Sequence, residues 1–500
     1  MTDKTPTNPD LMEKLISLCK RRGFVYQGSE IYGGLAGTWD YGPLGVALKN
    51  NIKDSWRKKF VSSRDDMYEV DAALLMNAKV WETSGHVGGF SDPMVECRNC
   101  KKRFRVDQIV DSIDYQKQIE NLEKDLSGHV IFQKGKISIL NEMKRFLGVG
   151  AQDYLNLKKI SCQNCNSVDW DIPKQFNMMF KTQIGAMEDS AATIYFRPET
   201  AQGMFVNFKN ILDSFSPKLP FGMAQIGKAF RNEITPRDFI FRVREFEQME
   251  IEYFVDPRNP EKVQEIFDML YEEQQDFLRE IGVDTSRLHK IEVPESDRAH
   301  YSSRSIDTEF DFPFGQKELL GLAYRTDFDL SAHAKASGAE LTVFDDETKD
   351  RFIPHCIEPT FGVERLLLAL LTSAYREDEQ NGEVRSYLSF KPSIAPILCA
   401  VSPLLKNKPE LQEKAREVFS MLKREFGRVM YDDNGNIGKR YRRQDEIGTP
   451  WCVVADFETL GAEAGKEDLA GTVTIRDRDT GTQERIAITE LVSWMRAKIS

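Results

Sequence analysis

The stretch from Phe230 to Tyr253 places its charged residues with a regularity that few folds accommodate. Two strand-like arms are joined by a polar turn. The second arm, residues 241–255, alternates with a period of two, so successive side chains point to opposite faces of a strand. One face is mostly apolar. The other carries arginines, then an aromatic ring, then carboxylates, in the order Arg242, Arg244, Phe246, Gln248, Glu250 and Glu252.

On the first arm, Arg231 and Glu233 also share a face. Such a surface suits an anionic group at one end, a flat ring in the middle and an ammonium group at the other end. Arginine suits phosphate because its planar fork donates two parallel hydrogen bonds. The alternative is a solvated strand face with cross-strand salt bridges. The combination of these residues favours a ligand site.

The whole chain has the composition of an ordinary globular protein, with 41% hydrophobic and 29% charged residues. Its 500 residues predict roughly two to four domains. No apolar run reaches the roughly 18 residues of a membrane helix, and the polar N-terminus lacks a signal core. We therefore expect a cytoplasmic protein without a membrane partner. The net charge of −11 argues against nonspecific coating of nucleic acid, but not against a local basic patch that binds RNA.

Hydrophobic periodicity outlines the elements along the chain. It predicts helices over residues 10–27, 46–60 and 364–375, and extended chain over 67–81, 301–330 and 351–357. Two charged, helix-prone segments, 107–159 and 256–300, have the character of insertions. A break near residues 377–396 precedes a strand and helix alternation that predicts a separate α/β domain.

The stretch at 230–253 resembles the second signature motif of class II aminoacyl-tRNA synthetases, whose pattern is met by Arg231, Glu233, Arg242 and Phe246. The third signature of that class is met by Gly362 and Arg365, which precede the apolar run LLLALL. An arginine at a helix start is unusual because that end favours anions. The residue either faces a polyanion or is a helix-end arginine that snorkels to solvent.

Further motifs make the chain similar to the single-polypeptide, homodimeric glycyl-tRNA synthetases over most of residues 10–380. The motifs are Ser84-Gly85-His86, Phe104-Arg105-Val106-Asp107, Asn177-Met178-Met179-Phe180, Arg197-Pro198-Glu199-Thr200-Ala201-Gln202-Gly203 and Glu358-Pro359-Thr360-Phe361-Gly362. Two departures stand out. The first class signature lacks its proline near Val70–Leu75, and Thr360 stands where the family usually has serine.

The resemblance implies an α+β catalytic core built on an antiparallel sheet, followed by an α/β anticodon-binding domain. The expected boundaries are residues 1–390 for the core and 391–500 for the second domain. The core would contain a zinc-knuckle and helical insertion at 97–165 and a helical insertion at 256–300. The implied reaction is ATP-dependent attachment of glycine to tRNA(Gly) through a glycyl-adenylate, with release of AMP and diphosphate.

The resemblance also implies roles in binding ATP and magnesium. Arg231 would hold the α-phosphate and the glycine carboxylate, Glu233 the adenine side, and Glu318 a magnesium ion. Arg242 and Arg365 would bind the γ-phosphate, and Phe246 and Arg365 would sandwich adenine. The catalytic residues would be Arg231, Glu233 and Arg365. The complete ATP-binding set is Arg231, Asn232, Glu233, Phe241, Arg242, Val243, Arg244, Glu245, Phe246, Glu318, Leu319, Gly362, Val363, Glu364 and Arg365.

A site for glycine must exclude every larger side chain. Carboxylates pressed against the α-carbon would do this and would also bind the ammonium group, and Glu199, Glu250 and Glu358 match the three glutamates of the family. A larger competitor must clash, so no editing domain is needed. Arg105 and Arg325 are weaker candidates for holding the substrate. The complete glycine-binding set is Arg105, Glu199, Phe246, Glu247, Gln248, Met249, Glu250, Glu358, Pro359, Thr360, Phe361 and Gly362.

The expected chemistry needs no protein nucleophile, since the glycine carboxylate attacks the α-phosphate and the terminal ribose hydroxyl of tRNA then takes the glycyl group. Catalysis would be positioning and charge neutralisation. In keeping with this, His86, His333 and His355 have no metal-like spacing and are predicted to be structural.

Four cysteines form two CxxC pairs, Cys97 with Cys100 and Cys162 with Cys165. In a cytoplasmic chain this spacing predicts a tetrahedral zinc site, and the alternative is unmetallated thiol pairs. Near the other end of the chain, Lys439, Arg440, Tyr441, Arg442 and Arg443 form a basic run around an aromatic ring. Anticodon bases would stack there with phosphates on the cations, unless the run is a solvated helix start.

Three alternative functions predict other residues. A binding module that has lost the chemistry would lack Arg231, Glu233, Arg242 or Arg365, and all four are present. A class II enzyme for proline, threonine, serine or histidine would lack the three glutamates. An adenylating ligase that does not use tRNA would lack the C-terminal domain.

Overall fold

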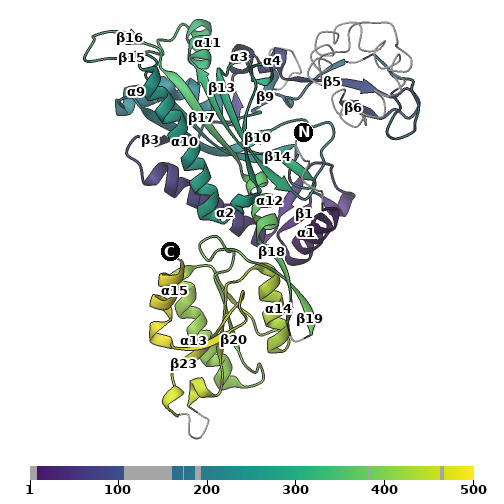
Figure 1. The fold of residues 1–500 in the computed structure, drawn as a ribbon, viewed down its shortest axis with the longest axis vertical. Helices are drawn as coiled ribbons and strands as arrows, with labels where there is room; N and C mark the ends of the chain where they lie inside the picture. Colours follow the sequence, from purple (N-terminus) through teal and green to yellow (C-terminus); the bar gives the residue numbers. More distant parts are fainter. Residues whose placement is uncertain are drawn as a thin grey trace. The chain divides into compact units, whose positions relative to one another are not determined.

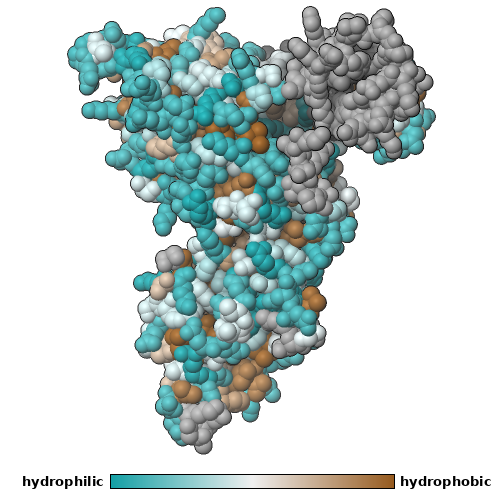
Figure 2. All heavy atoms as spheres, viewed as in Figure 1, coloured by the Kyte–Doolittle hydropathy of each residue, from teal (hydrophilic) through white to brown (hydrophobic). Residues whose placement is uncertain are grey.

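The computed structural model describes residues 8–105, 160–172, 174–185, 193–380, 382–461 and 467–499. The chain divides into two compact units. The larger comprises Met1–Ala73, Glu199–Ala229 and Arg237–Ser500, and the smaller Leu74–Pro198 and Phe230–Pro236. Among the described residues, no helix is long and apolar enough to cross a membrane. The face drawn in Figure 2 is mostly hydrophilic, with hydrophobic residues in small patches.

The larger unit is built on a seven-stranded sheet of order β12-β13-β14-β17-β11-β10-β3 (Figure 1). Neighbouring strands from β12 to β11 run antiparallel, and β10 runs parallel to β3. The strands are β3 (Met67–Glu69), β10 (Phe221–Phe230), β11 (Glu245–Val255), β12 (Leu288–Glu292), β13 (Arg304–Phe312), β14 (Gly315–Thr326) and β17 (His355–Gly362). The expected sheet, largely antiparallel, is confirmed.

Different helices cover the two faces of this sheet because side chains alternate along each strand. On one face, Met249, Ile251 and Tyr253 share a core with α2 (Pro43–Arg57), α10 (Pro260–Ile281) and α12 (Val363–Ala374). On the other face, Phe254 and Cys356 pack with α9 (Ala201–Phe215) and α11 (Phe328–Ser337). The polar side chains of Gln248, Glu250 and Glu252 are at even-numbered positions of β11, as Phe254 is. They therefore lie on the face of the sheet that α9 and α11 cover.

Local capping sets the helix boundaries. Helix α1 (Pro9–Arg22) ends at Gly23, which has a φ of +79°. Glycine adopts this left-handed conformation without steric strain, so it commonly terminates helices. A short strand, β1 (Val25–Gln27), follows. The predicted helix over 10–27 is therefore too long at its end. Helix α10 starts where the side chain of Asn259 accepts a hydrogen bond from the Lys262 N–H, and it ends at Gly282.

The segment 256–300, predicted to be a helical insertion, contributes to the core of the larger unit. The apolar stripe of α10 is buried against the sheet, and β12 forms the sheet edge by pairing with β13. The expectation of extended chain over 67–81 is wrong for its last part, since α3 (Ala78–Thr83) follows the short strands β3 and β4 (Leu75–Met76).

The C-terminal part has a five-stranded sheet of order β21-β20-β22-β23-β24 and its own buried core. Its elements are β20 (Cys399–Pro403), α13 (Pro409–Phe426), β21 (Val429–Tyr431), α14 (Ile437–Ile447), β22 (Trp451–Ala455), β23 (Thr472–Asp477), β24 (Gln483–Ala487) and α15 (Leu491–Ile499). The predicted α/β alternation is confirmed. A two-stranded ribbon, β18 (Tyr375–Gln380) with β19 (Glu383–Leu388), precedes it.

The smaller unit contains two three-stranded sheets, β4-β9-β8 and β6-β5-β7. The strands of these sheets beyond β4 are β5 (Ser91–Glu96), β6 (Arg103–Arg105), β7 (Lys174–Asn177), β8 (Lys181–Gln183) and β9 (Thr193–Phe196). A short helix, α4 (His86–Gly89), precedes β5. The predicted helical insertion at 107–159 lies outside the described residues.

Candidate functional site

The polar face of β11 forms the floor of the candidate site. Gln248 and Glu250 are 5% and 2% exposed, and the Gln248 Nε2 donates to Glu250 Oε1 over 2.7 Å. In the register with β17, Gln248 lies opposite Gly362 and Glu250 opposite Thr360. Gln248 and Glu250 were predicted to share a strand face with Phe246, and all three lie in β11 at alternate positions. The strand begins at Glu245, however, and not at Phe241. Residues 239–244 belong to the connection before it.

The start of α9 holds the carboxylate of Glu250. The backbone N–H of Thr200, at the N-cap, donates to Glu250 Oε2 over 3.1 Å, and the Thr200 hydroxyl donates to the same oxygen. The positive end of a helix dipole favours a carboxylate at this position. Glu199 precedes Thr200 and accepts a hydrogen bond from Gln202 Nε2 over 3.1 Å. Two of the three predicted glutamates are thus tied to the same helix end.

The third glutamate, Glu358 on β17, is bound to a buried arginine. Arg325 donates to Glu358 Oε1 over 2.8 Å and to both oxygens of Asp329 over 2.8 and 3.0 Å. Burial raises the pKa of Glu358 to about 8 against the opposing effect of Arg325, and the charges of Glu250 and Glu199 add to the rise. The structure thus brings the three predicted glutamates into electrostatic contact.

Two buried oxygens on this face have no hydrogen-bond partner within the described part of the chain, Gln248 Oε1 and Glu252 Oε1. Glu252 accepts from the Cys356 thiol over 2.8 Å through its other oxygen. Burial holds the pKa of Glu252 well above its ordinary value, and the charge of Glu358 adds to this. An unpaired buried acceptor costs about 1–3 kcal/mol, so the Gln248 oxygen fits an incoming donor.

A second group of charges surrounds the start of α12. Arg365 lies 3.2 Å from Glu318 Oε2, and its guanidinium carbon lies 4.5 Å from the Phe241 ring centroid. In the sheet, Glu318 lies opposite Glu309. Burial raises the pKa of Asp307, on the same strand as Glu309, to about 7, and the charges of Glu318 and Glu309 contribute. This cluster combines carboxylates that suit a hard cation with an arginine that suits phosphate.

Several predicted site residues point away from this face. Glu247 lies 2.7 Å from the buried Lys49 and 2.9 Å from Lys53, and Glu364 lies 2.6 Å from Lys49 and accepts from the Glu247 N–H. Both carboxylates thus pair with a buried lysine of the core instead of joining the polar face of β11. Four apolar side chains of the predicted set are also buried in the core that α2, α10 and α12 share with the sheet, namely Met249, Leu319, Phe361 and Val363.

The smaller unit holds four of the predicted substrate-binding residues, Arg105, Arg231, Asn232 and Glu233. Arg231 follows β10 and donates from Nε to the Pro198 carbonyl over 3.1 Å, and its guanidinium lies 5.4 Å from the Phe90 ring centroid. The Asn232 N–H donates to the Met178 carbonyl. Arg105 is ion-paired with Asp92 at 2.6 Å. The Pro198 carbonyl and the Phe90 ring thus help to orient the Arg231 guanidinium, a group whose planar fork suits an anionic ligand.

The two CxxC pairs converge in the smaller unit. The Sγ atoms of Cys97, Cys100, Cys162 and Cys165 all lie within 4.8 Å of one another, with Cys97 to Cys165 at 3.6 Å and Cys100 to Cys162 at 3.7 Å. Tetrahedral zinc with Zn–S bonds of about 2.3 Å requires S–S separations of about 3.8 Å. The cluster therefore has the donor atoms and spacing of a four-thiolate zinc site.

The two pairs also repeat one backbone pattern. Lys101 N–H donates to the Cys97 carbonyl and Asn166 N–H to the Cys162 carbonyl, each over 2.8 Å, and both donors have φ of +58°. The backbone N–H of Ser167, followed by the Asn99 amide, lowers the pKa of the Cys165 thiol to about 6. Such turns favour thiolates, the form that binds metal.

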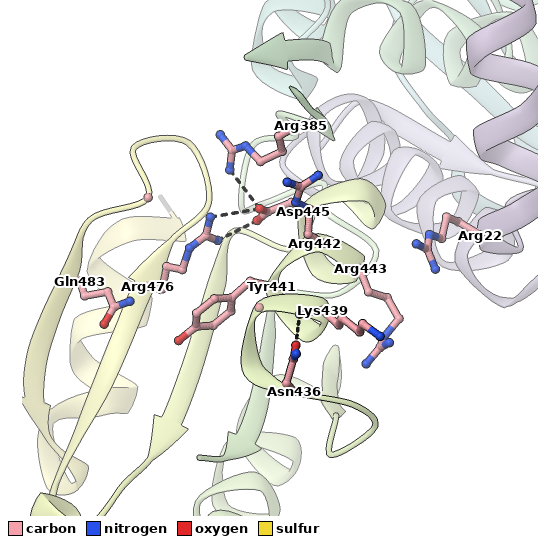
Figure 3. A pocket seen from close by; sticks show the side chains of 12 residues that line it. Arg22, Arg385, Asn436, Lys439, Tyr441, Arg442, Arg443, Asp445, Arg476 and Gln483 are labelled. Carbon is pink, nitrogen blue, oxygen red and sulfur yellow. Dashed lines mark hydrogen bonds and ion pairs between the residues drawn. The ribbon is translucent and has the colours of Figure 1, made fainter. Parts of the chain in front are cut away.

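The C-terminal part contains a basic cavity of about 910 Å³ (Figure 3). Its lining combines residues from four distant segments: Arg22, Arg385, Asn436, Gly438, Lys439, Tyr441, Arg442, Arg443, Asp445, Arg476, Gly481 and Gln483. Asp445 accepts from Arg385 over 3.0 Å and from Arg476 over 2.8 and 3.0 Å. Arg476 also lies 4.8 Å from the Tyr441 ring centroid. One carboxylate thus orients two arginines beside an aromatic ring.

The basic run predicted from the sequence contributes four of its five residues to this cavity. Lys439, Tyr441, Arg442 and Arg443 line the cavity. Arg440 does not, since it is 2% exposed and donates to the backbone carbonyls of Asp433 and Gly435. Consecutive residues on a helix differ by about 100° in direction, so the run cannot face one side. Arg22, Arg385 and Arg476 were missed because they are distant in sequence.

Comparison with known proteins gives two family models and close relatives. The model described as tRNA synthetase class II core domain (G, H, P, S and T) matches residues 180–374, and the model described as anticodon binding domain matches residues 398–498. Glycine–tRNA ligase of Clostridium kluyveri is 46% identical over 489 residues, which is 98% of each chain. The ligases of Thermus thermophilus and Deinococcus radiodurans are 46% and 45% identical over 98% of this chain and 99% of their own.

Proposed function

The chain belongs to the glycine–tRNA ligases, a family of class II aminoacyl-tRNA synthetases, and from that premise we propose which of its residues carry the reaction. The activity is ATP-dependent attachment of glycine to tRNA. The observation that carries the proposal is the convergence of three buried carboxylates, Glu199, Glu250 and Glu358, the last of which accepts a hydrogen bond from Arg325. Carboxylates that raise one another's pKa in this way suit an ammonium group.

Glycine binds with its ammonium group toward these three glutamates and the Gln248 oxygen. The β11 and β17 backbones run alongside the site, with Glu250 opposite Thr360. A side chain on the substrate would displace carboxylates that are already fixed by hydrogen bonds from Thr200, Gln248 and Arg325. Selection by exclusion follows, and it requires no editing site.

The first step is attack by a glycine carboxylate oxygen on the α-phosphorus of ATP, as the bond to pyrophosphate breaks. Arg231 neutralises charge on the α-phosphate and the glycine carboxylate, while Arg242 and Arg365 neutralise the outer phosphates. Glu233 binds the adenine side, and Phe246 stacks on the ring with Arg365. Glu318 binds a magnesium ion that accompanies ATP, and Glu309 and Asp307 add negative charge beside it.

The second step transfers the glycyl group to tRNA. A hydroxyl of the terminal ribose attacks the glycyl carbonyl, AMP leaves, and the hydroxyl proton is lost to the departing phosphate or to water. None of the residues assigned here acts as a nucleophile. The catalytic effect is positioning and electrostatic stabilisation.

The reaction is tested by ATP–pyrophosphate exchange with each amino acid in turn, followed by charging of tRNA. Glycine is expected to support exchange, whereas alanine and serine are expected to support little. Exchange driven by alanine or serine but not glycine would falsify the assignment of the three glutamates.

Glycine binding is expected to strengthen as pH rises from about 6.5 to 8. Glu358 is mostly protonated below its pKa of about 8, and a bound ammonium favours the ionised carboxylate. Binding therefore releases a proton, and the apparent KM for glycine falls by up to about tenfold per pH unit before it levels off. Exchange kinetics at several pH values measure this. A flat or rising KM over that range contradicts it, and the KM for ATP serves as the internal reference.

The cysteine cluster binds one structural zinc ion per chain. Inductively coupled plasma mass spectrometry of freshly reduced protein is expected to give about one zinc, and Cys97→Ser to give much less with increased protease sensitivity near residues 97–105 and 160–172. Cys356→Ser, which alters a buried cysteine outside the cluster, is the matched control. If the reduced wild-type protein contains no zinc, the proposed zinc site is wrong.

The basic cavity of the C-terminal domain, for which we take residues 391–500, binds the anticodon of tRNA(Gly). Bases stack at Tyr441 while phosphates contact Lys439, Arg442 and Arg443. The double variant Lys439→Glu and Arg442→Glu is expected to lower kcat/KM for tRNA by about 10-fold or more, with glycine-dependent exchange unchanged. Lys414→Glu, on α13 outside the cavity lining, is the control. Equal loss of exchange and charging would argue against an anticodon role.

The enzyme acts as a homodimer in the cytoplasm, where its tRNA is charged. Ile31 and Tyr32 are 89% and 87% exposed, and neighbouring Leu35 is also exposed. Large apolar side chains that are exposed close together are typical of a protein–protein interface. Sedimentation should give two 57.4 kDa chains, and Ile31→Asp combined with Tyr32→Asp should shift the distribution to single chains. A wild-type protein that sediments as a single chain refutes the dimer.

A further inference from the structure

A chain of hydrogen bonds lies behind the proposed glycine carboxylates, on the side of α9 and α11. His333 Nε2 lies 2.8 Å from Gln202 Oε1, and Gln202 Nε2 donates to Asp329 Oδ1 over 2.8 Å and to Glu199 Oε1 over 3.1 Å. All four side chains are buried. None of the three added residues, Gln202, Asp329 and His333, belongs to the predicted glycine-binding set.

The chemistry of the partners determines one arrangement of these groups. The Gln202 amide nitrogen faces two carboxylates, so both of its hydrogens are donated and its oxygen must accept. That oxygen lies within hydrogen-bond distance of His333 Nε2, which therefore carries a proton. Burial lowers the pKa of His333, against the opposing charge of Asp329, so the neutral ring with its proton on Nε2 fits. Reversal of the amide would place its oxygen against two carboxylates.

The chain continues from Asp329 to the third glutamate. Asp329 accepts two hydrogen bonds from Arg325, and Arg325 donates to Glu358. Arg325 is the extra residue of a β-bulge, since Tyr324 pairs with Ile357 and Thr326 with Cys356. A bulge redirects a side chain, and here the next residue, Thr326, has φ of +59°. A β-branched residue is strained at that angle, which indicates that the surrounding bonds hold it there.

We propose that His333 and Gln202 are positioning residues of the glycine site, in which His333 fixes the Gln202 amide so that it holds Glu199 directly and Glu358 through Asp329 and Arg325. The proposal rests on the proposed glycine role of these glutamates. It distinguishes the pair from ordinary core residues, because a buried polar network of this kind brings less stability than apolar packing of the same volume. Its value is in the orientation of charged groups that contact the substrate.

The test compares two replacements of His333 in glycine-dependent ATP–pyrophosphate exchange. In His333→Gln the side-chain amide nitrogen can occupy the place of Nε2 and donate to Gln202, whereas His333→Leu cannot donate. His333→Leu is expected to raise the KM for glycine by about 10- to 100-fold with the KM for ATP unchanged. His333→Gln is expected to stay within about threefold of the wild type. His289→Leu, which removes a half-exposed histidine paired with Asp311, is the matched control.

Gln202→Glu provides an isosteric second test. Its ionised carboxylate repels Glu199 and Asp329, so the KM for glycine should rise with pH, opposite in sign to the wild type. Equal impairment by His333→Gln and His333→Leu overturns the proposal. So does a parallel rise in the KM values for glycine and ATP, or a lowered melting temperature without a change in either KM. If the wild-type protein itself fails to activate glycine, the proposed glycine site is wrong. This outcome differs from a failure of the positioning proposal alone, in which the wild-type protein activates glycine.

Discussion

Replacement of Arg231 by alanine is expected to lower the rate of glycine-dependent ATP–pyrophosphate exchange by about 10²- to 10³-fold, the loss typical of one removed electrostatic stabiliser. The guanidinium is held by the Pro198 carbonyl and the Phe90 ring. It is therefore oriented before the reaction begins. Its removal takes away a fixed positive charge where negative charge accumulates on the α-phosphate.

Arg231→Lys separates charge from geometry. Lysine retains the charge but lacks the planar fork that binds two oxygens at once, so it should recover only a small part of the lost rate. The exposed Arg237, in the same connection between β10 and β11, supplies the control Arg237→Ala, which should behave as the wild type. Exchange by Arg231→Ala within a few-fold of the wild type would exclude the proposed role.

The second large effect is expected for Glu250→Gln, which should raise the KM for glycine by about 10- to 100-fold and leave the KM for ATP nearly unchanged. A hydrogen bond to a charged group contributes about 1.5–3 kcal/mol, which corresponds to this range. The substitution keeps the shape of the side chain. It removes the charge, and it also sets an amide against Gln248 and Thr200, which both donate to Glu250.

Steady-state exchange kinetics and a thermal melt measure the effects of Glu250→Gln on binding and on stability separately. Glu292→Gln, in the surface ion pair with Arg304, applies the same chemical change on edge strand β12 and should alter neither KM. If Glu250→Gln binds glycine normally, the carboxylate of residue 250 does not contact the ammonium group.

The alternation of β11 made the polar face of the site predictable. Residues of one parity, from Phe246 to Glu252, do lie on one side, because a strand has a period of two. Glu247 was included in the predicted glycine-binding set because of its neighbourhood in sequence, although the same periodicity places its side chain on the opposite face of the strand. Its partner Lys49 is almost 200 residues away, and no local pattern predicts such a pair.

Other features depend on tertiary structure alone. The bulge that turns Arg325 inward adds one residue to a strand, and side-chain alternation does not reveal where a strand gains a residue. The cavity around Tyr441 collects Arg22, Arg385 and Arg476 from three separate elements. By contrast, the two CxxC pairs were predictable because metal-ligand spacing is encoded locally, and the structure confirms that their sulfur atoms converge.

The bonds among Lys49, Glu247 and Glu364 bear on how this enzyme can be engineered. They join α2, β11 and α12, three segments that are distant from one another in the sequence. A chimera that imports the hairpin of another class II enzyme without a carboxylate at 247, or the helix without one at 364, leaves a lysine ammonium buried with half its partners. Breaking a buried pair in this way destabilises by about 3–5 kcal/mol, a large share of the stability of a typical domain. The three segments are therefore a single unit of exchange.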